Sequence, residues 1–125
     1  SSAASDVYKR QTMQQMWEQR REHFAMLHDA GVQLLPGTDS GGYQPHGELG
    51  RELSLWERGG VSSREIIDFA TWRARDYLGI GAIEPGARAD YLRYSLEPSG
   101  DLARATKPEK VALLGKEFSP KAAVN

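Results

Sequence analysis

The sequence contains no cysteine among its 125 residues. Disulfide bridges, cysteine-ligated zinc and a cysteine nucleophile are therefore excluded, although the cellular compartment is not decided by this absence. No apolar run approaches the roughly 18 residues that a transmembrane helix needs. The first residues also lack the apolar core of a secretory signal. We therefore expect no membrane partner; the compartment stays open because the true N-terminus is expected to be missing, with the cytoplasm favoured.

An excess of charge of either sign is also lacking. The chain has 16 basic and 17 acidic side chains, for a net charge of −1. Without a basic excess, nucleic acid is not an expected partner. The glycines form neither a G-x-G-x-x-G pattern nor a Walker A loop, so a nucleotide-binding fingerprint is absent too. The length fits one ordinary domain.

The first eleven residues are unusual because part of them matches the translation of a known nucleotide sequence. Residues 6–11 read D-V-Y-K-R-Q, the translation of GAT GTG TAT AAG AGA CAG, which resembles the mosaic-end adapter of transposase-based sequencing libraries. The alternative is a short polar lead into a helix. We exclude residues 1–11 from fold reasoning as an adapter artefact. Since the chain also has no initiator methionine, we expect it to be the C-terminal fragment of a longer protein.

The most informative stretch is V-Q-L-L-P-G-T-D-S-G-G at 32–42. A short apolar run bounded by turn residues predicts a strand buried on both faces, as in a parallel sheet under helices. Asp39 follows the carboxyl end of this strand, where parallel α/β folds build their active sites. A plain turn also explains the pattern, because aspartate often bonds nearby backbone N–H groups. Residue types alone favour the turn.

Three helices are predicted around this stretch. Apolar residues at three- and four-residue steps predict a helix over 12–30 and another over 48–59. The capping box S-S-R-E opens a third helix over 62–78. We expect the apolar stripe of the first helix to pack in a core; it consists of Met13, Met16, Trp17, Phe24, Leu27 and Ala30.

The composition changes near residue 80, which suggests a boundary between an α/β part at 12–80 and a small β part at 81–118. A tyrosine- and leucine-rich strand is predicted over 89–96. Gly115-Lys116 between two apolar segments predicts a two-residue hairpin turn. Residues 119–125 are expected to form a frayed tail.

His46 lies in the same glycine-rich loop as Asp39. A histidine and an aspartate can share a metal or a proton, but two ligands do not make a zinc site. T-D-S-G-G also resembles the G-D-S-G-G around the nucleophile of chymotrypsin-like proteases. Those enzymes are all-β, whereas this motif lies between a predicted strand and helices with no His/Asp pair placed for a triad. A serine protease is therefore not favoured.

The order of several motifs resembles the amidohydrolase superfamily. A-G-V-Q-L-L-P-G-T-D-S-G at 30–41 is similar to its last barrel strand, and P-H-G at 45–47 to the loop that follows. G-A-I-E-P-G-A-R-A-D-Y at 81–91 resembles the exit from the barrel, and V-A-L-L-G-K-E at 111–117 the closing hairpin. The nearest branch is that of the imidazolonepropionase-like and Xaa-Pro-dipeptidase-like enzymes. The similarity covers residues 24–118.

This resemblance implies the last strand and flanking helices of a metal-dependent (β/α)8 barrel, with strands of a small β-sandwich. It implies a hydrolase of carbon–nitrogen bonds in small amides, cyclic amides or dipeptides, with one or two divalent ions, usually zinc. Asp39 would contact the metal and relay a proton, and His46 would line the substrate side. Ala89-Asp90 would be structural. Homo-oligomerisation of the full-length enzyme stays open.

Most of such an enzyme is missing from this sequence. A barrel of this kind needs about 250 residues, and the expected H-x-H pair, bridging Lys or Glu, and two further histidines have no candidates here. We therefore expect the fragment alone to be inactive, with exposed apolar surface. The alternative is a stand-alone binding module in which Asp39 is a turn residue.

Overall fold

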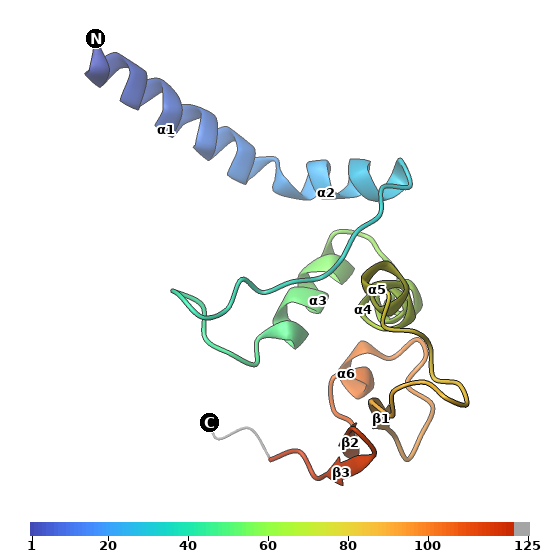
Figure 1. Cartoon of the computed structure of the whole chain (residues 1–125). Helices are drawn as coiled ribbons and strands as arrows, with labels where there is room; N and C mark the ends of the chain where they lie inside the picture. Colours follow the sequence, from blue (N-terminus) through green and yellow to red (C-terminus); the bar gives the residue numbers. More distant parts are fainter. Residues whose placement is uncertain (122–125) are drawn as a thin grey trace. The chain divides into compact units, whose positions relative to one another are not determined.

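The computed structural model describes residues 1–121. The chain forms two compact units, Ser1–Leu34 and Leu35–Asn125. Described elements of the first unit are helices, whereas the second combines short helices with an antiparallel sheet (Figure 1). The predicted mixed α/β class is therefore confirmed, although the barrel itself is not tested. The end of the predicted tail, residues 122–125, lies outside the described residues.

The first unit contains α1 (Ser2–Glu18) and α2 (Arg20–Asp29). The helix predicted over 12–30 is confirmed except for a break at Gln19, where φ is −92° and ψ is 7°, and the chain is already helical from Ser2. The Arg20 guanidinium group stabilises the break. It lies 4.1 Å from the centre of the Trp17 ring and donates a hydrogen bond of 2.7 Å to the Trp17 carbonyl.

The apolar stripe of this unit does not form a core. Trp17 is 66% exposed, and no side chain of α1 or α2 is buried among the described residues. The prediction of core packing is therefore wrong for this structure. An amphipathic stripe is buried only where another apolar surface covers it, and residues 1–34 supply none.

The strand predicted before Asp39 is also wrong. The chain is extended there, but no strand is assigned over 32–35, and Val32 and Leu35 are 43% and 37% exposed. A buried strand requires neighbours on both edges, because its backbone N–H and C=O groups must all be paired. The described residues provide no such neighbour.

Three helices begin the structured part of the second unit: α3 (Leu49–Arg58), α4 (Ser63–Ala70) and α5 (Trp72–Leu78). The predicted cap of α4 is confirmed. The Ser62 hydroxyl accepts a hydrogen bond of 3.3 Å from the backbone N–H of Glu65, which satisfies one of the free donors at the helix start.

The helix predicted over 62–78 breaks at Thr71, where φ is −121° and ψ is −98°. The Thr71 hydroxyl donates a hydrogen bond of 2.7 Å to the Ile67 carbonyl, a local bond of the kind that bends helices. The chain changes direction here. Leu78, at the end of α5, is 61% exposed.

The core is small, and most of it lies among the helices. Short helix α6 (Leu102–Ala105) contacts α3 and α4 there. Trp56 and Phe69 meet edge to face with ring centres 5.5 Å apart. Among the described residues, the buried apolar side chains are Leu53, Trp56, Val61, Ile66, Phe69, Leu102 and Ala112.

The sheet joins β1 (Tyr91–Arg93), β2 (Lys110–Leu113) and β3 (Lys116–Phe118) in antiparallel order β1-β2-β3. The strand predicted over 89–96 is thus shorter than expected. The predicted hairpin is confirmed, but its turn lies at Leu114-Gly115, with φ of 51° and 80°. Two positive φ values define the type I′ turn that matches the twist of a hairpin.

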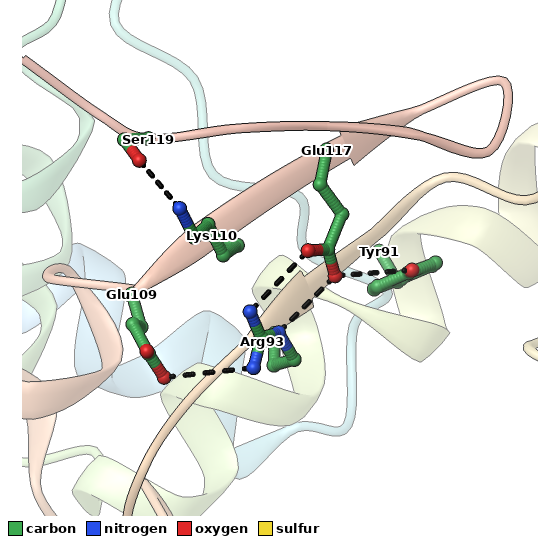
Figure 2. Close-up of polar contacts among 6 residues, drawn as sticks. All are labelled: Tyr91, Arg93, Glu109, Lys110, Glu117 and Ser119. Atoms are coloured by element: carbon green, nitrogen blue, oxygen red, sulfur yellow. Dashed lines mark hydrogen bonds and ion pairs between the residues drawn. The ribbon is translucent and has the colours of Figure 1, made fainter.

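One face of the sheet is polar (Figure 2). The Arg93 guanidinium group donates hydrogen bonds of 3.1 and 3.3 Å to the two carboxylate oxygens of Glu117 on the far strand. The Tyr91 hydroxyl donates one of 3.3 Å to the same carboxylate, and Glu109 lies 3.9 Å from Arg93. The small side chain of Ala112 in the middle strand leaves room for side chains of β1 and β3 to meet across it.

The other face of the sheet turns towards α4 and α5. An open groove of about 500 Å³ separates them, lined largely by apolar side chains that include Ile67, Leu78 and Leu92. Several large apolar side chains of the described chain are exposed, as expected. None of the helices described is long and apolar enough to cross a membrane.

Candidate functional site

Asp39 lies in the loop between the extended segment and α3. Its side chain is exposed, and its backbone φ is 52°, in the left-handed region. Few residues other than glycine adopt this conformation, but aspartate is among those that tolerate it. The carboxylate is therefore presented to solvent by an uncommon backbone shape.

The loop after Asp39 closes on itself. Gly41 donates its backbone N–H to the Gln44 carbonyl at 3.2 Å, and Ser40 forms a β-bridge with Gln44. Gly41 has a φ of 109°, which L-amino acids rarely adopt. The closed loop returns the chain towards α3 within a few residues.

His46 lies against this turn. Its Cε1 atom is 3.8 Å from the position that a Cβ at Gly41 would take, so the imidazole ring packs beside the Gly41 α-carbon. The His46 side chain is exposed. Within residues 1–121, no hydrogen bond or ion pair joins His46 to Asp39. The structure thus places both predicted residues in one loop without direct bonding.

The donor set for a metal is incomplete. No group of three or more His, Asp or Glu side chains that could hold an ion occurs in the part of the chain that the structure describes. A metal site in a hydrolase needs about three protein ligands, and the loop that carries Asp39 and His46 does not bring three together. These residues by themselves do not fit a catalytic metal, and they could supply one ligand to a larger set.

A second polar cluster was not predicted from the sequence. The Arg75 guanidinium group donates hydrogen bonds to the carbonyls of Gly81 at 2.7 Å and Asp90 at 3.0 Å. The Asp90 carboxylate in turn accepts the backbone N–H of Leu114 at 2.7 Å. These hydrogen bonds link α5 to the hairpin. They give Ala89-Asp90 the structural role that the resemblance implies. Arg75 carried no sequence signal, because its partners are backbone groups.

Comparison with known families matches residues 11–121 to the amidohydrolase family. The chain belongs to the amidohydrolase family. The match includes the Asp39 loop, the three helices that follow it and the sheet. It supports a hydrolase in the broad sense, and members of this amidohydrolase family generally use divalent metals.

Curated relatives extend the comparison. One protein from Mycobacterium bovis and two from Mycobacterium tuberculosis, each named "Uncharacterized protein", are 33% identical to this chain over 96 residues. The aligned part is 77% of this chain but 26% of each relative. The amidohydrolase chain described here therefore spans about a quarter of the length of the relatives it matches.

Proposed function

We propose that this chain is part of a metal-dependent hydrolase of carbon–nitrogen bonds, with small amides, cyclic amides or dipeptides as substrates. The observation that carries the proposal is the Asp39 loop, in which an exposed carboxylate follows an extended segment inside the amidohydrolase match. The imidazolonepropionase-like and Xaa-Pro-dipeptidase-like branches, and the placing of this loop at the top of a (β/α)8 barrel, belong to the same proposal.

Asp39 has two tasks in this proposal. Its carboxylate supplies one ligand to a divalent ion, zinc by preference, and the other ligands come from outside residues 1–121. When bound, such an ion lowers the pKa of coordinated water towards about 7. Asp39 accepts the proton of the attacking water on a carboxylate oxygen and returns it to the leaving amine. His46 contacts the substrate from the same loop.

The chain alone is inactive in this proposal. A single exposed carboxylate does not hold a divalent ion against water, and the described residues contain no group of three or more potential ligands. Within residues 1–121, the apolar segment before Asp39 also has no strand partner, which supports this expectation.

The decisive experiment uses the natural longer polypeptide that contains this sequence. Hydrolysis is measured on a panel of N-acyl amino acids, a cyclic amide and dipeptides, before and after removal of metal by a chelator. We expect activity that chelation abolishes and zinc restores. Asp39→Asn should lower kcat by about 10²–10⁴-fold, the usual contribution of a general acid–base group.

Asp76→Asn serves as the matched control, because Asp76 is also an exposed carboxylate and lies on α5. It should leave kcat unchanged. An Asp39→Asn enzyme as active as the parent enzyme would contradict the catalytic role of Asp39. Activity that is insensitive to chelation would contradict the metal-dependent reaction.

A further inference from the structure

The backbone of Asp39 is held by its neighbours rather than by its own side chain. Within the described residues, its carboxylate makes no hydrogen bond or ion pair, yet its φ of 52° is uncommon for any residue other than glycine. Such backbone shapes persist where the surroundings determine them. The source of that constraint must therefore lie in the adjacent loop.

Gly41 is the first part of the constraint. Its φ of 109° combines with the left-handed Asp39 two residues earlier, and its N–H group closes the loop onto Gln44 at 3.2 Å. A side chain at this φ is strained whatever space surrounds it. Gly42 differs, because its φ is ordinary and a Cβ there would meet nothing within 4 Å.

His46 is the second part. Its Cε1 atom lies 3.8 Å from the position that a Cβ at Gly41 would take, which is a van der Waals distance. His46 lies three positions before Leu49, the first residue of α3, and Leu53 and Trp56 of this helix are buried in the core. His46 is therefore close in the chain to an element with buried side chains, and its ring offers a surface against which the turn packs.

We propose that Gly41 and His46 are positioning residues for Asp39. Gly41 allows the chain to reverse direction, and the His46 ring packs on Gly41. Together the two residues fix the left-handed backbone of Asp39, which sets the direction of its carboxylate. This role rests on the proposed hydrolase function for its catalytic meaning. It also gives His46 a task in the free protein, before any substrate is present.

The test is nuclear magnetic resonance of the 125-residue chain, with Asp39 read out by its amide–α-proton coupling and its carbon chemical shifts. Gly41→Ala should move both Asp39 signals and speed hydrogen exchange of the amide at position 41 by about 10-fold or more, because a strained backbone opens more often. Gly42→Ala, the matched control, should leave the coupling, shifts and exchange rate unchanged.

The His46 arm separates packing from chemistry. His46→Ala should shift the Asp39 signals in the same direction as Gly41→Ala, and His46→Phe should restore them, since a ring of similar shape covers Gly41. The indole signal of buried Trp56 reports in every variant that the core is folded.

Four results count against the proposal. Unchanged Asp39 signals in Gly41→Ala remove the role of Gly41, and unchanged signals in His46→Ala, or no restoration by His46→Phe, remove that of His46. Equal effects of Gly41→Ala and Gly42→Ala would show a loop without a specific constraint. None of these readouts needs activity, so a longer polypeptide that is inactive with normal Asp39 signals would contradict the hydrolase alone.

Discussion

The Asp90 carboxylate accepts a hydrogen bond of 2.7 Å from the backbone N–H of Leu114, 24 residues further along the chain. Leu114 has a positive φ of 51° and occupies the first position of the hairpin turn. The Asp90 carboxylate also pairs with Arg88 at 2.5 Å. A side chain at the start of the β region thus holds the turn that closes it.

Asp90→Ala should therefore destabilise the second unit. The change removes a charge-assisted hydrogen bond from the exposed Leu114 N–H, which costs about 1 kcal/mol because water can replace the acceptor. Urea-induced unfolding followed by fluorescence measures the loss. Asp90→Asn keeps an acceptor oxygen and should lose less. Equal stability of Asp90→Ala and the parent chain would contradict the role of this bond.

The sequence predicted those elements whose causes are local. The Ser62 cap needs only a serine three residues before a free N–H, and it is confirmed. The hairpin was found from Gly115, but its turn was placed one residue late, because either position of a two-residue turn accepts glycine. In the structure Leu113 pairs with Lys116, so the two turn residues are Leu114 and Gly115.

Burial could not be predicted where it depends on absent neighbours. Apolar residues at helical or strand spacing indicate a surface that has to be covered, but they do not supply the cover. Trp17 and Val32 belong to segments with helical and strand-like apolar spacing, but both side chains are exposed. For the candidate site, the loop and its residues Asp39 and His46 could be predicted from the sequence. It could not give the left-handed backbone or the packing of His46 on Gly41.

Tyr94 should make the second unit sensitive to alkaline pH. Its hydroxyl donates a hydrogen bond of 2.6 Å to the Ala105 carbonyl, and burial raises the pKa of this phenol above its ordinary value of 10.0. The folded state therefore keeps the proton to higher pH than the unfolded state. The resulting stability is complete below pH 10 and is lost as the pH rises through the folded-state pKa.

Tyr94→Phe removes both the bond and the titration. We expect a free energy of unfolding about 1 kcal/mol lower at neutral pH and a shallower fall with pH in the alkaline range. Tyr77→Phe is the control, because Tyr77 is exposed on α5. Parallel stability curves for Tyr94→Phe and the parent chain above pH 10 would contradict the titration of Tyr94.

Ile66→Ala should be the most damaging of the single core truncations. Ile66 is 0% exposed and belongs to α4, which contacts α3 and α6. Its truncation costs about 2–5 kcal/mol, including the cavity that remains, and a core this small has little stability to lose. Leu78→Ala should change stability by about 0.5 kcal/mol or less, since Leu78 is largely exposed. Similar losses for both variants, measured in urea, would show that Leu78 is covered in solution.

Zinc should bind the 125-residue chain weakly. The Asp39 carboxylate is exposed, and the described residues contain no group of three or more His, Asp or Glu side chains that could hold an ion. Because a lone carboxylate competes poorly with water for a divalent ion, isothermal titration should give no saturable heat at micromolar zinc, and Asp39→Asn should give the same trace. The longer polypeptide, stripped of metal and titrated in parallel, should bind zinc tightly and lose affinity on Asp39→Asn. Tight stoichiometric binding by the isolated chain would place a complete metal site within these residues and contradict the proposed division of ligands.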